Sequence, residues 1–267
     1  MDLGTIIGLV GSLMIVVVVL ILDGGTPAEL FTHPSAILLT LGGSLTATIM
    51  SSAFKASTKL PVLIMLAFRQ NHFEEMAAIE SLSSMADKAR REGLLALEEE
   101  SKKITDPFLQ KGIMMVVDGV DPNQVRQVLE TSIDEMRVRH KMGYSLFNTA
   151  GGFAPTFGII GTVMGLISVL KSLSDPNKLA SSIGAAFLAT LWGLLSANLI
   201  WMPLGSKLKS KSDEEAAYRH MMLEGVLAIQ AGENPRIVRE KLLAYLPPKE
   251  AAKESTAAGA EAQKAKA

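Results

Sequence analysis

The 267-residue chain contains no cysteine, so it can form neither a disulfide nor a thiolate metal site and has no cysteine nucleophile. Its four histidines are far apart in the sequence and lack the spacing of a metal site. Lys and Arg number 26 against 27 Asp and Glu, a balance that is untypical of nucleic-acid-binding proteins. Motifs of phosphate-binding loops, zinc proteases and serine hydrolases are also missing. We therefore expect no enzyme activity, no cofactor, no metal and no nucleic-acid partner.

Charge is missing from four long stretches of the chain, at residues 3–22, 34–54, 145–170 and 179–205. A helix of 20 residues is about 30 Å long, which matches the hydrocarbon core of a bilayer. The first stretch is too long for a signal peptide and follows Asp2 rather than a base. Four buried helices of a soluble protein are the alternative, but such helices rarely lack charge over this length. The pattern predicts an all-α membrane protein with four transmembrane helices.

The basic residues are distributed unevenly between the connecting segments. Of the 26 Lys and Arg residues, 24 lie in residues 55–141 or after residue 205, and two lie between the third and fourth stretches. In membrane proteins the cytoplasmic segments carry the excess of Lys and Arg. We therefore expect a multi-pass protein with both termini in the cytoplasm.

The chain is expected to divide into five parts: transmembrane helices one and two (1–54), a helical cytoplasmic insert (55–144), transmembrane helices three and four (145–205), a cytoplasmic helical region (206–248) and a disordered tail (249–267). Within the insert, Asp106-Pro107 and Asp121-Pro122 are helix starts and Gly119 is a stop. The helix that begins at Pro122 meets no Gly or Pro before Gly143, so we expect it to run on into the third span. The tail consists mainly of Ala, Lys, Glu and Gln and lacks a core.

The region after the fourth span has its own helix signals. A polar run after Pro203 is expected to lead into an amphipathic helix that ends at Gly232. Asn234-Pro235 then starts a last short helix, which closes at Pro247-Pro248.

The interiors of the four predicted spans contain no Asp, Glu, Lys, Arg or His. An ion or proton relay inside a membrane usually depends on an ionisable side chain. Either this chain conducts nothing, or a partner helix supplies the titrating group.

Small residues follow one another at helical spacing in the last two spans. They are Ala185, Ala189, Gly193 and Ala197 in span four, and Gly161 and Gly165 in span three. Small residues allow helices to approach closely in a membrane. The close packing is either within one subunit, or between subunits and around a guest helix.

Two threonines and two prolines also mark these spans. Thr162 and Thr190 are mid-span hydroxyls, which usually bond the carbonyl four residues earlier in their own helix. Pro155 and Pro203 remove backbone hydrogen bonds and so permit either simple bending or a hinge.

Five sequence blocks in this order resemble the flagellar motor stator A-subunit family (MotA/PomA). The blocks are MADKARREGLLALEEE, DPFLQKGIMMVVDGVDPNQVR, APTFGIIGTVMGL, AAFLATLWGLLSAN and EGVLAIQAGENPRIV. The resemblance covers nearly the whole chain except the tail after Lys249. It implies a subunit of the bacterial inner membrane that turns ion flux into torque, and so a role in motility and chemotaxis.

The resemblance also implies partners and roles for particular residues. Family members form a homopentamer around the helices of a single-span B subunit, whose membrane Asp takes up the ion. The residues expected to contact the rotor switch protein are Arg90, Arg91, Glu98 and Glu99. Those expected in the ion pathway are Thr162 and Thr190, and those expected at hinges are Pro155 and Pro203.

The resemblance leaves the transported ion as H⁺ or Na⁺. Sodium-driven members have Thr at the position of Thr162, as this chain does, but they tend to have Thr where this chain has Ala189. A hydroxyl can replace water around Na⁺, whereas a proton needs no such shell. General likeness to PomA favours sodium slightly.

Two other functions compete with the stator. An ExbB/TolQ-type energiser of an envelope complex resembles spans three and four, but such proteins have three spans rather than four. A membrane scaffold without ion flux would use the charged insert only as a docking site.

Overall fold

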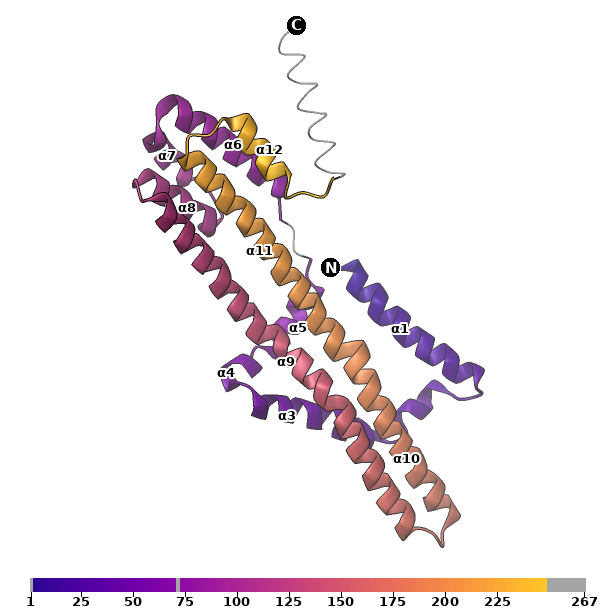
Figure 1. The fold of residues 1–267 in the computed structure, drawn as a ribbon. Helices are drawn as coiled ribbons and strands as arrows, with labels where there is room; N and C mark the ends of the chain where they lie inside the picture. The colour runs from indigo at the N-terminus through magenta and orange to yellow at the C-terminus, as the bar shows by residue number, and fades with distance from the viewer. Residues whose placement is uncertain (1, 71–72, 249–267) are drawn as a thin grey trace. The chain divides into compact units, whose positions relative to one another are not determined.

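The structure is a computed structural model that describes residues 2–70 and 73–248. Helices form all the regular structure in these residues, which confirms the all-α prediction (Figure 1). The chain divides into two units, Met1–Asn71 with Val138–Lys211, and His72–Arg137 with Ser212–Ala267. We call the first the transmembrane unit and the second the helical unit. The tail predicted to be disordered, 249–267, lies outside the described residues.

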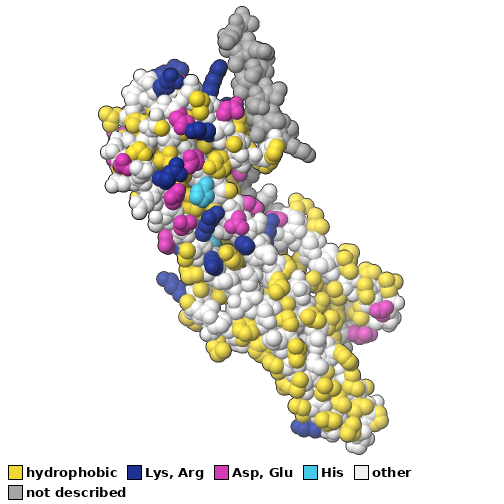
Figure 2. Space-filling view, viewed as in Figure 1, with side chains coloured by type: hydrophobic (Ala, Val, Ile, Leu, Met, Phe, Trp, Pro, Cys, Tyr) yellow, Lys and Arg dark blue, Asp and Glu magenta, His cyan; other side chains and the backbone are white. Residues whose placement is uncertain are grey.

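The transmembrane unit contains the four helices that are long and apolar enough to cross a bilayer in the described chain. The first is α1 (Leu3–Leu22), and the second is made of α2 (Pro34–Ile37), η2 (Leu38–Gly42) and α3 (Gly43–Ser51), with η1 (Pro27–Phe31) between the two spans. The third span is the later part of α9 (Pro122–Lys171), and the fourth is α10 (Pro176–Leu195) with η4 (Ser196–Trp201). In Figure 2 the visible surface over these helices is largely hydrophobic, as contact with lipid requires.

Two spans depart from regular α-helix. Segments η2 in span two and η4 in span four are π-helical, with a wider turn than an α-helix. In span four the cause is Pro203, whose ring nitrogen cannot donate to the carbonyl of Leu199, so the preceding turn widens. The helix therefore passes through Pro203 and continues as α11 (Met202–Gln230). The polar run that was predicted to precede a helix is itself helical.

Two short helices, α4 (Phe54–Ser57) and α5 (Leu60–Phe68), follow span two and belong to the transmembrane unit. Leu60 and Ala67 are buried in the same hydrophobic cluster as Phe147 and Trp201. The transmembrane unit therefore includes residues 55–71, and the start of the cytoplasmic insert at residue 55 remains a prediction. The reason for this inclusion is that α5 is apolar and packs against the spans.

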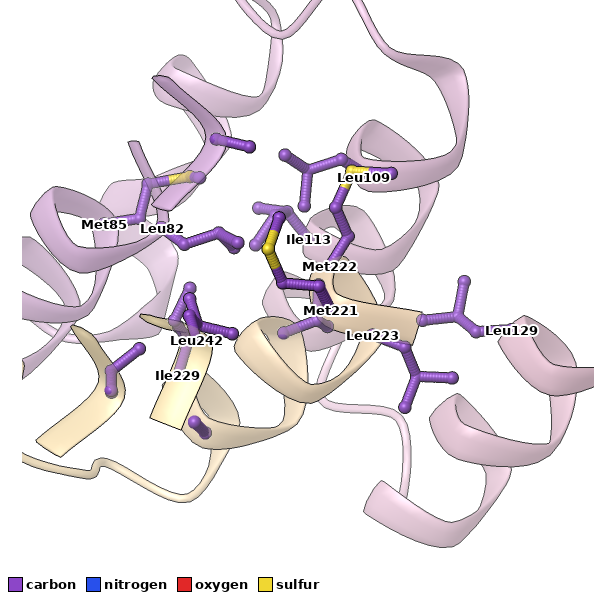
Figure 3. Packing of buried hydrophobic residues seen from close by; sticks show 14 of the residues in the cluster. Leu82, Met85, Leu109, Ile113, Leu129, Met221, Met222, Leu223, Ile229 and Leu242 are labelled. Carbon is purple, nitrogen blue, oxygen red and sulfur yellow. The ribbon is translucent and has the colours of Figure 1, made fainter. Parts of the chain in front are cut away.

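The helical unit is built from short helices around the first part of α9, up to residue 137, and the last part of α11, from residue 212. The short helices are α6 (Glu75–Glu92), η3 (Leu94–Ala96), α7 (Leu97–Ser101), α8 (Pro107–Val117) and α12 (Pro235–Leu243). Figure 3 shows leucine, isoleucine and methionine side chains from α6, α8, α9, α11 and α12 meeting in one core. Helix α9 contributes an apolar stripe to this core, since Val125, Leu129, Ile133 and Met136 are all buried.

The helix boundaries in this unit agree with the sequence signals. The Asp106 carboxylate accepts hydrogen bonds from the backbone N–H groups of Phe108 and Leu109 at the start of α8. Gly93, Gly119 and Gly232 each end a helix with positive φ, a conformation that glycine adopts without strain. Helix α9 is continuous from Pro122 into the third span, as predicted.

Candidate functional site

Helices α9 and α10 pack closely along their glycine and alanine residues. A methyl group added to Gly158 would lie 3.1 Å from the Ala189 carbonyl oxygen and 3.2 Å from the Thr190 Cα. One added to Gly193 would lie 2.8 Å from the Ala154 carbonyl oxygen. These glycines therefore allow backbone to lie against backbone, as small residues do in membrane helix pairs.

The small residues predicted in span four are used largely within this chain. Ala189, Gly193 and Ala197 are buried by the chain itself. A methyl group on Gly161 would clash with Ala189, and one on Gly165 would lie 2.5 Å from the Ala186 Cβ. Of the two alternatives, packing within one subunit is what these contacts show.

Ala185 differs from the other small residues because it is only half-buried. With Gly161 and Gly165 it lines a groove between span two and the α9–α10 pair, where Leu39 and Gly43 form the opposite wall. At this groove, packing of the small residues against another subunit or a partner helix remains a prediction.

Thr162 and Thr190 lie side by side across the α9–α10 contact, and their hydroxyl groups hydrogen-bond each other. The Thr162 hydroxyl also lies 3.1 Å from the Gly158 carbonyl oxygen and 3.3 Å from the Ala186 carbonyl oxygen. A hydroxyl carries one proton, so when Thr162 donates to a carbonyl, Thr190 must donate to Thr162. For Thr162 the expected bond to the carbonyl four residues earlier is present, and the contact with Thr190 is additional to it.

Three more hydroxyls in span two were not singled out from the sequence. Thr40, Ser44 and Thr48 are fully buried. Their hydroxyls donate to carbonyl oxygens of the same helix, Thr40 to Ala36 at 2.9 Å and Thr48 to Ser44 at 2.7 Å. Their spacing of four residues, which places them on one face of the helix, was the signal that could have identified them.

The two prolines occupy different settings. Pro155 lies inside α9 and is half-buried, and the helix continues through it. Pro203 is exposed in the first turn of α11, directly after the π-helical turn. A hinge at either residue remains a prediction.

The four charged residues expected to face a partner lie around one turn of the helical unit. Arg90 and Arg91 are in the last turn of α6, and Glu98 and Glu99 are in the first turn of α7. All four are exposed. Gly93, with φ of 86°, reverses the chain between the two helices and so brings the basic and acidic pairs onto neighbouring turns.

Partners within the same helix hold two of these side chains. The Arg91 guanidinium lies 2.9 Å from the Asp87 carboxylate, and the Lys102 ammonium lies 3.2 Å from the Glu98 carboxylate. Such exposed pairs contribute about 0–1 kcal/mol, so another charge can replace them at low cost.

An ion pair beneath this surface joins α6 to α7. The Lys88 ammonium lies 2.9 Å from Glu100, and this hydrogen bond raises the pKa of Lys88 and lowers the pKa of Glu100. Lys103, 3.1 Å from Glu100, lowers the pKa of Glu100 further. Next to this pair, Leu97 is fully buried. The turn that carries the exposed charges is therefore held in place by the Lys88–Glu100 ion pair and by the packing of Leu97.

Leu95 is an exposed apolar residue that the sequence reasoning missed. It lies in η3, between the basic pair of α6 and the acidic pair of α7, and it is 75% exposed. The signal was a leucine two residues after a helix-ending glycine, where a polar residue is more usual. A partner that contacts the charges can also bury this side chain.

A second group of contacts ties α11 to the start of α1. Lys207 forms an ion pair with Asp2, and this pair, with the hydrogen bond from the Thr5 N–H, lowers the pKa of Asp2 to about 2. One turn further along, buried Lys211 donates to the Leu66 carbonyl oxygen at 2.7 Å and to the carbonyl of Arg69. None of these contacts was predicted from the sequence.

Across residues 2–70 and 73–248, no three His, Asp or Glu side chains are grouped so that they could hold a metal ion. A family profile described as the MotA/TolQ/ExbB proton channel family matches residues 100–221. Among curated proteins, the chain is similar to Motility protein A of Borreliella burgdorferi, with 41% identity over 238 residues, which are 88% of this chain and 92% of that protein.

Two further comparisons extend this likeness. Chemotaxis protein PomA of Vibrio alginolyticus is 36% identical over 249 residues, which are 92% of this chain and 96% of that protein. The solved flagellar MotAB stator complex from Bacillus subtilis has a chain of 36% identity that matches with a TM-score of 0.86, covering 93% of this chain and 97% of that chain.

Proposed function

The chain belongs to the motility protein A family of flagellar motor stator subunits, and we propose from this premise which of its parts carry the ion and the torque. As an A subunit of a stator, it is a multi-pass inner-membrane protein of a complex that converts ion flux into rotation. The match over about nine-tenths of its length and the four spans favour this function over an ExbB/TolQ-type energiser.

We propose a partner that supplies the ionisable group that the span interiors of this chain lack. The interiors of the described spans hold no Asp, Glu, Lys, Arg or His, yet flux through a membrane usually depends on an ionisable side chain. The solved relative is a MotAB complex. By analogy, a single-span B subunit with a membrane Asp would supply the titrating carboxylate to this chain, with the A subunit as a homopentamer around it.

The Thr162–Thr190 pair is the observation that carries the proposed ion path. Both side chains are half-buried in the chain, so a partner helix could contact them. A hydroxyl can coordinate a cation or pass a proton, because it both accepts and donates hydrogen bonds. We place the B-subunit carboxylate near Thr190, because the Thr190 side chain is only half-buried by this chain.

The transported ion in this proposal is H⁺ or Na⁺. The slight preference for sodium drawn from likeness to PomA is not supported, because a Motility protein A is 41% identical and the PomA is 36% identical. Thr162 and Ala189 then remain the two positions that bear on the ion.

Torque is assigned to the exposed turn of the helical unit. Arg90, Arg91, Glu98 and Glu99 present both signs of charge to a partner, and Leu95 adds an apolar contact. Charge patterns of this kind select a partner and its register more than they add affinity. The proposed partner is the rotor switch protein, in the cytoplasm with both termini of this chain.

The proposal is tested with liposomes that hold either this chain alone or this chain with its B subunit. We expect ion flux above the empty-liposome rate only with both proteins, and no flux when the membrane Asp of the B subunit is replaced by Asn. Flux through liposomes that hold this chain alone would overturn the assignment of the carboxylate to a partner. In cells, deletion of the gene should stop swimming while filaments are still assembled.

A further inference from the structure

Helix α5 (Leu60–Phe68) is apolar all round but is covered by protein on one side only. Leu60 is 8% exposed and Ala67 is fully buried, and both face the hydrophobic cluster of the transmembrane unit. On the outer side, Val62 is 63% exposed and Met65 is 71% exposed. A helix that is hydrophobic on every side is normally surrounded by protein core or by lipid. The outer face of α5 therefore needs an apolar cover.

Hydrogen bonds fix α5 at the edge of the membrane-spanning region. The backbone N–H of Asp2 donates to the carbonyl oxygen of Phe68 at 2.9 Å, and the next residue, Leu3, begins span one. Lys211 holds the same end of α5 through the Leu66 carbonyl. Nine residues form a helix of about 14 Å, less than half of the bilayer core, so α5 cannot cross it.

The charges around α5 indicate the chemistry of its surroundings. Lys59 and Arg69 flank the two ends of α5, Lys55 lies in the preceding helix α4, and all three are exposed. The sequence contains no Asp or Glu between Glu29 and Glu74. Basic residues beside an apolar face complement the anionic headgroups and the acyl chains of phospholipids. A second copy of the same face would instead bring like charges together.

We propose that the outer face of α5 binds the membrane surface and selects anionic phospholipids. Val62, Met65 and Leu66 enter the boundary between headgroups and acyl chains, and Lys55, Lys59 and Arg69 contact the phosphate groups. The assignment rests on the exposed face and its position beside span one, and it does not depend on the ion or on the rotor partner.

The depth of the outer face of α5 in the membrane is tested by fluorescence quenching in liposomes that hold the chain with a cysteine-free B subunit. A fluorophore attached to Met65→Cys should be quenched more by a shallow nitroxide lipid than by a deep one, and little by aqueous iodide. Ile15→Cys, on the exposed side of span one, is the deep control, and Glu80→Cys, exposed in the helical unit, is the aqueous control. Iodide quenching of Met65→Cys equal to that of Glu80→Cys would overturn the proposal. So would oxidative cross-linking of Met65→Cys copies, which would place a second chain on this face.

The charge selectivity is tested with brominated phosphatidylglycerol and brominated phosphatidylcholine at equal mole fraction. We expect the anionic lipid to quench the Met65→Cys fluorophore about twofold more. In the Lys55→Gln, Lys59→Gln, Arg69→Gln background the two lipids should quench equally. The matched control, Arg91→Gln, Lys102→Gln, Lys103→Gln, removes three exposed bases of the helical unit and should keep the difference. Equal quenching without the α5 substitutions would overturn the selectivity.

Discussion

Thr190 of α10 and Thr162 of α9 share a hydrogen bond between their hydroxyl groups, across a helix contact that glycine and alanine make close. The Thr162 hydroxyl can also donate to a carbonyl oxygen of its own helix or of α10. The pair is therefore a small polar site in spans whose interiors carry no charge. Its energetic weight within the fold is modest, because interhelical hydrogen bonds of this kind average about 0.6 kcal/mol in membrane proteins.

Thr190→Ala is expected to slow ion-driven rotation severalfold while the complex still assembles. The substitution removes a hydroxyl but leaves the small-residue packing in place, and Thr190→Ser should restore most of the speed. Rotation is measured by tethered-cell or bead assay, and assembly by co-purification of the B subunit. A Thr190→Ala variant that rotates at full speed in both high and low sodium would assign the pair to helix packing alone.

Thr162→Ala distinguishes the two candidate ions. If the ion is Na⁺, loss of a coordinating oxygen should weaken the dependence of swimming speed on external sodium. If the ion is H⁺, the variant should swim nearly normally and the speed should follow pH instead. The measurement is speed against sodium concentration at fixed pH, with Thr156→Ala, an exposed hydroxyl on the same helix, as the control.

Arg90→Glu is expected to impair swimming without lowering the amount of protein in the membrane. An exposed charge contributes about 0–1 kcal/mol to stability, whereas like charges across an interface cost several kcal/mol. Lys111→Glu, an exposed reversal on α8, should have little effect. Restoration by an opposite reversal on the rotor protein would support direct contact. Normal swimming of an Arg90→Glu, Glu98→Lys double variant would contradict it.

The Lys88–Glu100 ion pair should make the stability of the helical unit depend on acid. The pKa of Glu100 is lowered below its ordinary 4.5 by the Lys88 hydrogen bond, so its contribution is present above pH 4.5 and is lost as pH falls through the lowered pKa. Between pH 5 and about pH 3, the melting temperature of the full chain should therefore fall more than that of a Lys88→Gln, Glu100→Gln variant. Parallel acid curves for the two proteins would show that the pair does not stabilise the fold.

The proposed topology is tested with single cysteines in this cysteine-free chain. A membrane-impermeant thiol reagent should label Thr26→Cys in intact cells and spare Ser84→Cys, and both positions are exposed in the structure. After the cells are permeabilised, both should react. Labelling of Ser84→Cys alone in intact cells would reverse the orientation.

Sequence patterns predicted the elements better than their mutual contacts. The four uncharged runs, the Asp106 cap and the glycine stops depend on neighbouring residues, and all of them were found at the expected places. Thr162 and Thr190 were each singled out, but whether two helices turn these residues toward each other depends on their relative rotation. No local pattern records that rotation.

Helix α5 shows how tertiary contacts extend a compact unit beyond the end of a span. Its nine apolar residues are too few for a span and follow Lys55, so the sequence assigned them to the insert. Their place is set by residues far away in the chain, with Lys211 and Asp2 bound to the end of the helix. Contacts of this kind come from tertiary packing, and the same holds for the ion pair between Lys207 and Asp2.

The buried hydroxyls of span two bear on the order in which the protein is made. Thr40, Ser44 and Thr48 donate to carbonyls of their own helix, so their polar groups are satisfied before any other span is present. An unsatisfied polar group in hydrocarbon would cost several kcal/mol and would delay insertion until a partner arrived. Span two can therefore leave the translocon as a finished helix while spans three and four are still on the ribosome.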